Sequence, residues 1–201
     1  MKQLKIAYFN QLGRRELDQA KTKFEEEYPD TEVKLISTGY DEAFEKMADG
    51  EADLVIADKR DEKDDLERED LAQVGVMAIL PKGSYQSGIQ MVDKADLSDM
   101  TCFIVAKPEE EVAELHLFKD LYQVKSPFIA SNSVEEAALL VASGSGYFLI
   151  NEIAADLFKN DSLQKLFLTD NGAPMRQTIA AFYAEKNPTI AKFNEILKKE
   201  Y

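Results

Sequence analysis

Short apolar runs and segments with helical spacing alternate along the chain. In the first part, runs of strand length lie at residues 4–9, 33–36, 52–57 and 74–80. The segment after the first run carries apolar residues at three- and four-residue steps, which is typical of one face of a helix; these are Leu17, Ala20, Phe24 and Tyr28. A second helix is expected at about 41–49, ending at Gly50. Strands separated by helices predict right-handed βαβ units in a mainly parallel sheet.

The alternation repeats after Pro81-Lys82-Gly83. Strands are predicted at 101–106, 127–130, 147–150 and 163–168, and helices at 109–122, between Ser133 and Gly144, and at 151–158. After Asn171-Gly172-Ala173-Pro174 the chain returns with a strand at 178–184 and a helix at 189–199. Two crossings predict an α/β fold of two lobes, residues 1–80 plus 176–201 and residues 81–175, each a sheet flanked by helices.

The stretch 131–150 is the most clearly delimited part of the chain. Ser133 and Glu136 have the spacing of a reciprocal capping box, which predicts a helix start. Gly144 can end the helix in the left-handed conformation, and Gly146 allows a turn directly into the next strand. Leu139 and Leu140 add apolar surface opposite the face that should meet the core, so this helix is expected to have two partners.

Composition limits the classes of function. The chain has 201 residues and 45% hydrophobic residues, enough for a sizeable core. It shows no apolar run of membrane length and no secretory segment, so a cytoplasmic protein without membrane contact is expected. A net charge of −14 argues against direct contact with nucleic acid. Much of the acidity falls in residues 58–70, which are expected to form a solvated loop with at most a short helix.

Residues for catalysis or metal binding are scarce. His116 is the only histidine and Cys102 the only cysteine, and each is expected to be structural. The Gly144-x-Gly146 pair follows a helix and precedes a strand, the reverse of a dinucleotide-binding loop. We therefore expect no enzyme, no cofactor and no metal site.

Polar residues that follow strands suggest a binding function. Asn10 and Gln11 follow the first strand, and Ser131, Asn132 and Ser133 follow a strand of the second lobe. Ligands of open α/β sheets lie at such strand ends, and helix N-termini favour anions there. A small carboxylate or related anion is the expected ligand, and Lys107 is a candidate counter-ion. The alternatives are that Ser133 only caps its helix and that Lys107 is only an exposed lysine.

Four segments together resemble the effector-binding domain of LysR-type transcriptional regulators. They are LLVASGSGYFLINE, TEVKLISTGYDEAFEKMADGEADLVIAD, LKIAYFNQL and GVMAILPKG, in the family's order. The chain departs from the pattern at Asn151, where many members have proline. The resemblance implies the two-lobed type 2 periplasmic-binding-protein fold, with a small-molecule effector in the interlobe cleft controlling DNA binding and transcription. DNA contact would come only through the family's winged helix-turn-helix domain, which we expect to be absent from this chain.

The resemblance also implies site residues and a partner. Gln11, Tyr40, Asp58 and Ser133 fall near positions that line the effector cleft, although Tyr40 stands where many members have serine or threonine. A homodimer is implied, or a tetramer for the full-length protein. Its interface would set Leu139 and Leu140 of one subunit against the first long helix of the other, around Leu17 and Phe24. The alternatives are that both leucines are covered within their own lobe, and that the chain is a solute-binding receptor of a transporter.

Overall fold

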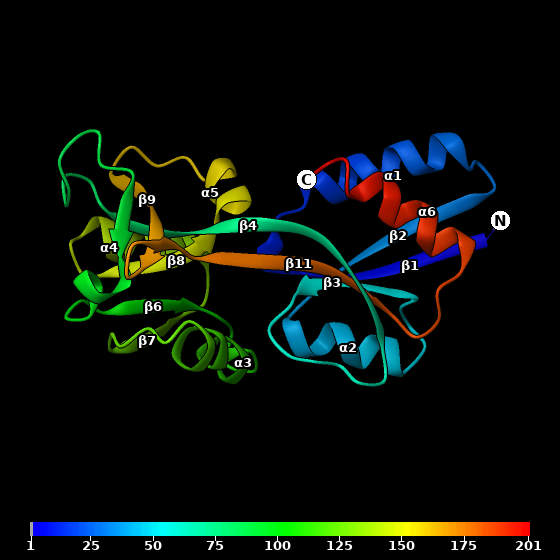
Figure 1. Cartoon of the computed structure of the whole chain (residues 1–201), viewed down its shortest axis with the longest axis horizontal. Coiled ribbons are helices and arrows are strands. Elements are labelled where there is room, and N and C mark those ends of the chain that lie inside the picture. Colours follow the sequence, from blue (N-terminus) through cyan, green and yellow to red (C-terminus); the bar gives the residue numbers. More distant parts are fainter. Residues whose placement is uncertain (1) are drawn as a thin grey trace. The chain divides into compact units, whose positions relative to one another are not determined.

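The computed structural model describes residues 2–201 and divides into two compact units, shown in Figure 1. Unit 1 consists of the chain up to Gln73 together with Thr178–Tyr201, and unit 2 is Val74–Gln177. The chain passes between the units inside two strands, β4 (Glu67–Pro81) and β11 (Arg176–Tyr183). The boundaries predicted from the sequence, 80/81 and 175/176, lie at the end of β4 and at the start of β11, whereas the two units divide within these strands. Turn-forming residues mark where a strand stops, whereas these strands continue from one unit into the other.

Unit 1 contains a mixed sheet with strand order β2-β1-β3-β11-β4. Strand β1 is parallel to β2 and β3, and β11 is antiparallel to β3. This arrangement confirms the predicted α/β class. Besides β4 and β11, unit 1 consists of β1 (Lys2–Phe9), the 3₁₀ helix η1 (Asn10–Leu12), α1 (Arg15–Glu27), β2 (Thr31–Thr38), α2 (Tyr40–Ala48), β3 (Leu54–Asp58) and α6 (Pro188–Leu197).

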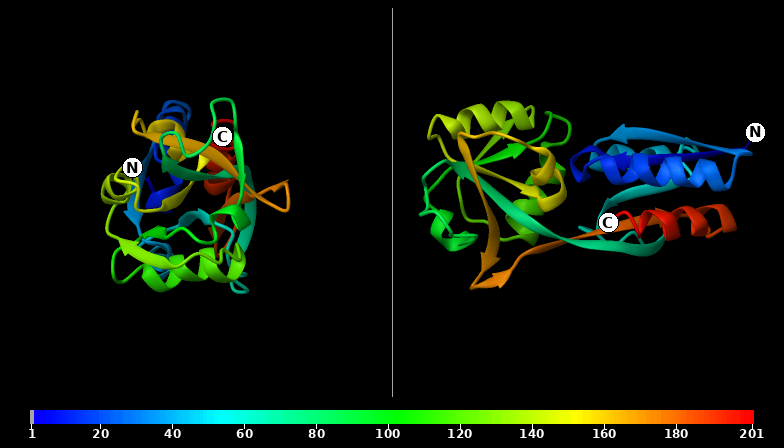
Figure 2. Two further views of the ribbon diagram at one scale, coloured as in Figure 1. Left: turned by 90° about the vertical axis from the view of Figure 1, so that its left-hand side faces the viewer. Right: turned by 90° about the horizontal axis from the view of Figure 1, so that it is seen from above.

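Helices α1 and α6 run side by side in unit 1, as Figure 2 shows. The rings of Phe24 and Phe193 join them, with centroids 5.7 Å apart in an edge-to-face arrangement. Leu17 and Phe24 are buried in the core of their own chain, at 0% and 1% exposure. The sequence-based placement of these two residues at a dimer interface is therefore wrong, because α6 already covers the apolar face of α1.

Unit 2 is a larger mixed sheet in the order β4-β8-β6-β7, with β9 paired to β4, β5 and β10. Strand β6 is parallel to β7 and β8, whereas β4 is antiparallel to β8 and β9. The elements are β5 (Met91–Asp93), the 3₁₀ helix η2 (Lys94–Leu97), β6 (Cys102–Val105), α3 (Glu111–Leu115), the π-helix η3 (His116–Leu121), β7 (Phe128–Ser131), α4 (Val134–Ala142), β8 (Tyr147–Asn151), α5 (Glu152–Leu157), β9 (Leu163–Asp170) and β10 (Ala173–Pro174).

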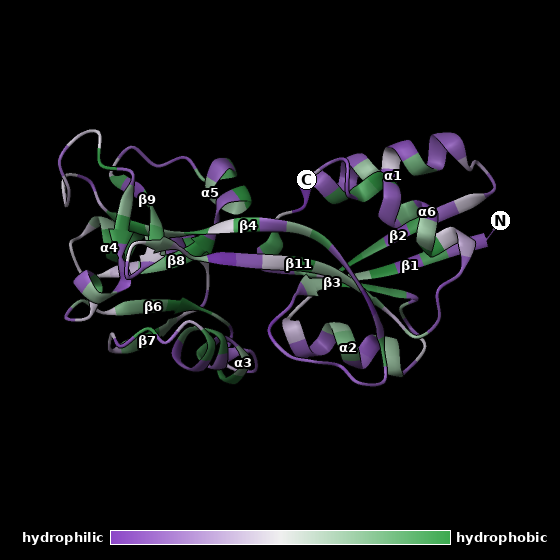
Figure 3. Cartoon of the chain, viewed as in Figure 1, coloured by the Kyte–Doolittle hydropathy of each residue, from purple (hydrophilic) through white to green (hydrophobic). Residues whose placement is uncertain are grey.

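Two apolar clusters make up the core of unit 2. One includes Phe118, Tyr147 and Leu166, and the other joins α4 and α5 to Phe103 and Phe148. Leu140 is partly buried and packs against the second cluster, so it faces outward less than its predicted place opposite the core implies. Leu139 is 72% exposed, as the two-sided pattern of the helix indicates. Figure 3 colours most of β1 and β6 as hydrophobic and much of α1 as hydrophilic.

The structure differs from the sequence pattern at several elements. The single helix expected at 109–122 is a short α-helix that widens to π geometry at His116. The short elements β5, η2 and β10 carry no periodic pattern and were not expected. Residues 67–70 lie in β4 rather than in a solvated loop. There the charged side chains are held by ion pairs, such as those of Glu69 with Lys186 and Lys198.

Helix α4 begins and ends where its sequence indicates. The Ser133 hydroxyl accepts a hydrogen bond from the Glu136 amide at 3.1 Å, which confirms the cap. Glu136, however, accepts from the backbone N–H of Asn132 at 2.8 Å and not from that of Ser133. Gly144 has φ +90° and Gly146 has φ +139°. A Cβ at Gly146 would lie 2.2 Å from the carbonyl oxygen of Thr101, so glycine is required there.

Candidate functional site

Three parallel strands of unit 1 end at the same edge of the sheet. The register places Phe9 beside Thr38 and Tyr8 beside Ile56, so the chain leaves β1, β2 and β3 at neighbouring positions. The predicted site residues follow directly. Asn10 and Gln11 lie in η1, Tyr40 is the first residue of α2, and Asp58 is the last residue of β3. The structure thus brings these four predicted residues to one edge, the usual place of ligand sites in α/β sheets.

A buried ion pair lies at this edge. Arg60 donates from Nε to Oδ1 of Asp58 at 2.8 Å and from a terminal nitrogen to Oδ2 at 2.6 Å. The Arg60 side chain is 0% exposed and that of Asp58 is 1% exposed. Two parallel charge-assisted hydrogen bonds are the strongest geometry in which arginine binds a carboxylate. Burial of both charges is tolerated because the two groups neutralise and hydrogen-bond each other.

Aromatic rings surround the Arg60 guanidinium. Its Cζ lies 3.9 Å from the centroid of Tyr40 and 5.1 Å from that of Phe9, and the two rings are perpendicular. The ammonium of Lys63 lies 4.5 Å from the centroid of Phe44 and 5.5 Å from that of Tyr40. Both cations are therefore within range of cation–π attraction.

Tyr40 carries a buried polar atom without a hydrogen-bond partner in the part of the chain that the structure describes. Its side chain is buried, and its hydroxyl has no hydrogen-bond partner within the described residues 2–201. Burial raises the pKa of Tyr40 above its usual value, and the charge of Asp58 raises it further. The phenol therefore remains protonated at physiological pH. A buried hydroxyl without a partner is costly, so this atom is well placed to meet a polar group of a ligand.

The expectation that residues 58–70 form a solvated loop is wrong for Asp58 and Arg60. Arg60, Phe9 and Lys63 were not among the predicted site residues. The available signal was the opposite charges of Asp58 and Arg60 directly after an apolar strand. A charged residue at that place can be buried when a counter-ion lies two positions away, but the sequence alone does not distinguish this from two solvated charges.

The predicted residues of unit 2 are engaged with one another and with Glu136. Ser131 donates its hydroxyl hydrogen to the carbonyl of Ser133. Asn132 donates both its backbone N–H and its side-chain amide to the Glu136 carboxylate, at 2.8 and 3.2 Å. These hydrogen bonds lower the pKa of Glu136. The N-terminus of α4 therefore already holds a carboxylate of its own chain. Lys107 is exposed and follows β6.

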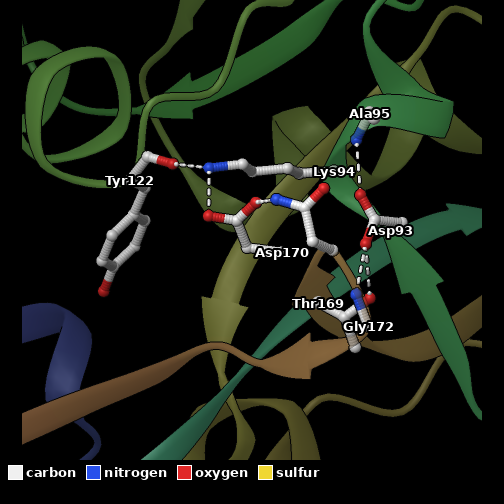
Figure 4. Close-up of polar contacts among 8 residues, drawn as sticks. Asp93, Lys94, Ala95, Tyr122, Thr169, Asp170 and Gly172 are labelled. Carbon is white, nitrogen blue, oxygen red and sulfur yellow. Dashed lines mark hydrogen bonds and ion pairs between the residues drawn. The ribbon is translucent and has the colours of Figure 1, made fainter.

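A second polar cluster lies in unit 2 around Asp93 and Lys94, as Figure 4 shows. Asp93 accepts hydrogen bonds from the Ala95 and Gly172 amides and from the Thr169 hydroxyl. The Lys94 ammonium binds Asp170 at 2.8 Å and the carbonyl of Tyr122 at 2.9 Å. A pocket of about 470 Å³ adjoins the cluster. Together these contacts tie β5 and η2 to the hairpin of β9 and β10 and to the end of η3, which indicates a structural role.

Groups for chemistry are few in the part of the chain that the structure describes. Within residues 2–201, no three metal-binding side chains gather at one place. The Cys102 thiol is buried, and burial raises its pKa to about 12. Nδ1 of His116 lies 3.0 Å from Oδ2 of Asp120, four residues further along the same helix. Such pairs are common on helix surfaces. Among the same residues, no helix combines the length and the apolar character needed to cross a membrane.

A family model described as the LysR substrate binding domain matches residues 1–201. The chain belongs to the LysR substrate-binding domain family. Members of this family are effector-binding regulatory domains of transcription regulators, as the sequence motifs indicated. No support emerges for the alternative of a transporter receptor. No curated protein sequence matches the chain significantly.

Solved structures of other LysR regulators share this fold. The effector-binding domain of a BenM variant matches with a TM-score of 0.82 at 16% identity, covering 100% of this chain and 95% of that one. The reduced regulatory domain of OxyR2 from Vibrio vulnificus has a TM-score of 0.78 at 18% identity, covering 100% and 96%. Full-length CbnR in complex with its target DNA has a TM-score of 0.75 at 16% identity, covering 100% and 70%. At such identities the likeness shows the fold alone.

Proposed function

We propose that this LysR-type domain senses a small molecule and controls transcription in the cytoplasm by a regulator of which it is part. The observation that carries the proposal is the group at the strand ends of unit 1, where Phe9, Tyr40, Asp58 and Arg60 converge. The partnerless hydroxyl of Tyr40 supports a ligand at this place. Asn10 and Gln11 follow β1 at the same edge and complete the proposed site.

Binding, rather than catalysis, is the proposed activity. A regulator responds to a ligand because the ligand has different affinities for two states of the protein. DNA contact belongs to another part of the regulator in this proposal, because a chain with a net charge of −14 has little to offer a phosphate backbone. Full-length CbnR, of which this chain covers 70%, is a solved structure in complex with its target DNA.

The charge of the effector is a separate question. The sequence predicts an anion at Gln11, Lys107 and the N-terminus of α4. The Glu136 carboxylate already accepts hydrogen bonds at that N-terminus, and the Asp58 carboxylate already binds Arg60. Support for an anion therefore rests on Gln11 and Lys107. A screen for the effector therefore has to include both cations and anions.

A thermal-shift screen tests the proposed function. The wild-type domain is heated with amino acids, amines, aromatic acids and sugar phosphates, each over a range of concentrations. An effector raises Tm with the logarithm of its concentration once this exceeds Kd. The same compound should stabilise Tyr40→Ala and Gln11→Ala less than wild type. Leu139→Ala, a change on the exposed face of α4, is the matched control and should respond like wild type. If no class of compound shifts Tm, the sensing function is contradicted.

We also propose a homodimer that uses the outer face of α4. Leu139 is 72% exposed on this helix, and a leucine left in water forgoes about 1.5–3 kcal/mol. Because Leu17 and Phe24 are buried, the opposing surface in this proposal is the polar outer face of α1. That face includes Gln19, Thr22 and Lys23.

A further inference from the structure

The groups that surround the Arg60 guanidinium belong to strands and a helix, whereas Arg60 itself does not. Asp58 is held in β3, where it pairs with Ile179 of β11. Phe9 ends β1 and Tyr40 begins α2, so both rings are attached to regular structure. Arg60 lies in residues 59–66, which form neither helix nor strand. Its guanidinium is also the end of a long side chain with many rotamers. The carboxylate and the two rings are therefore the fixed part, and Arg60 is the part that can move.

The fixed part has the chemistry of a cation site. Asp58 presents two oxygens to a pair of N–H groups, at 2.6 and 2.8 Å from the nitrogens of Arg60. Tyr40 and Phe9 present ring faces at 3.9 and 5.1 Å from the same guanidinium. Aromatic faces beside a carboxylate bind guanidinium and ammonium groups well. The buried Tyr40 hydroxyl adds an acceptor that Arg60 leaves unused.

The local charges favour the same kind of ligand. The carboxylates of Asp41, Asp58 and Asp61 all act on the Tyr40 phenol. Without the charge of Arg60, the ammonium of Lys63 remains close to the Tyr40 ring, and the three carboxylates outnumber it. The whole chain carries a net charge of −14, which raises the local concentration of small cations. An anion would have to displace Asp58 and then remain among these carboxylates.

We propose that Arg60 is a tethered internal ligand, and that the effector is a small guanidinium or alkylammonium compound that displaces it from Asp58, Tyr40 and Phe9. This inference rests on the proposed sensing function and specifies the class of effector. Displacement removes the contacts of Arg60 with Asp58 and the two rings, while the Lys59 amide stays bound to the Thr178 carbonyl, and the segment leads directly into β4 at Glu67. Because β4 continues from unit 1 into unit 2, the release of Arg60 is transmitted along the backbone to the strand that joins the units.

Chemical rescue tests the proposal. Arg60→Ala removes the internal guanidinium and leaves Asp58 and the rings in place. Methylguanidinium at millimolar concentration should then raise the Tm of Arg60→Ala in a saturable manner. It should bind wild type at least about tenfold more weakly, because the tethered group competes at an effective concentration in the millimolar range. Arg14→Ala is the matched control, since Arg14 forms an exposed ion pair with Asp18. It should respond to methylguanidinium as weakly as wild type does.

Several outcomes separate this inference from the sensing function. Adding Asp58→Asn to Arg60→Ala should abolish the rescue; a rescue of equal size would show that the probe binds elsewhere, which overturns the proposal. Stabilisation of Arg60→Ala by acetate or benzoate but not by methylguanidinium would also overturn it, while leaving the sensing function intact. If Arg60→Ala does not fold, the larger Arg60→Gln takes its place, and calorimetric titration of wild type with agmatine provides a second measurement. Agmatine binding that Asp58→Asn leaves unchanged contradicts the proposal.

Discussion

The hydroxyl oxygens of Ser126 and Tyr147 lie 2.6 Å apart in the core of unit 2. Ser126 donates its own hydrogen to the carbonyl of Leu97 at 2.9 Å, so the Tyr147 hydroxyl is the donor to Ser126. Both residues are buried, and the pair joins β8 to the segment before β7 and to η2. The two residues therefore make unequal contributions, although they share one hydrogen bond.

Ser126→Ala should destabilise the domain more than Tyr147→Phe does. Tyr147→Phe removes one donor and leaves Ser126 bound to Leu97, at a cost of about 1 kcal/mol. Ser126→Ala leaves both the Leu97 carbonyl and the Tyr147 hydroxyl without this partner in the core, which should cost about 2–3 kcal/mol. Urea unfolding of the two variants measures the difference. Equal losses would contradict the donor assignment.

Cys102 should be unreactive in the folded domain. Burial raises the pKa of its thiol to about 12, so the reactive thiolate is scarce at pH 7 to 8. Iodoacetamide at pH 8 should modify the native protein far more slowly than the urea-unfolded protein, which mass spectrometry would show. Peroxide should likewise leave Cys102 reduced. Rapid labelling of the native form would show that the segment around β6 opens readily.

Leu139→Glu should convert the proposed dimer into a folded monomer. The change places a charge on the outer face of α4, and twofold symmetry repeats it in the interface. Val112→Glu is a matched control, because Val112 is 81% exposed on α3. Sedimentation velocity should show a monomer for the first variant and a dimer for the second. Leu140→Glu should instead lower stability, because Leu140 packs against the core of unit 2.

Glu69 should contribute to stability above acidic pH and lose that contribution in acid. Burial pulls its pKa upward, but hydrogen bonds from Lys198, Asn194 and Lys186 outweigh burial and lower the pKa from 4.5. A lowered pKa in the folded state means that the contribution is full above about pH 4.5 and declines as the pH falls through the lower, folded value.

Replacing Glu69 with glutamine tests this pH dependence. Glu69→Gln should be less stable than wild type at pH 7, and the difference should shrink toward pH 3 in urea titrations. Glu62→Gln, at a 73% exposed side chain, is the control and should change little at either pH. A difference between Glu69→Gln and wild type that is constant with pH would mean that Glu69 acts through packing or shape rather than through its charge.

Local signals in the sequence were sufficient for most elements, but contacts between distant segments were not visible. Ser133 and Gly144 delimit α4 correctly because capping depends on residues a few positions apart. Leu139 and Leu140 looked alike, yet only the packing of α4 on the sheet decides that one is exposed and the other partly covered. Asp58 was predicted as a site residue by resemblance. Its pairing with Arg60 against Tyr40 depends on how three strands and a helix meet, which a pattern along the chain does not contain.

The order in which the chain is synthesised bears on the strand arrangement of unit 1. Strand β11 lies between β3 and β4 in the sheet, although it is made more than a hundred residues after β3 (Arg176 against Asp58). Unit 2 is one continuous segment, so all of its residues are available before Thr178 leaves the ribosome. The sheet of unit 1 stays incomplete between β3 and β4 until β11 and α6 have been synthesised. Unit 2 should therefore be the first to fold during translation, and a chain truncated before Arg176 should retain an ordered unit 2 beside an incomplete unit 1.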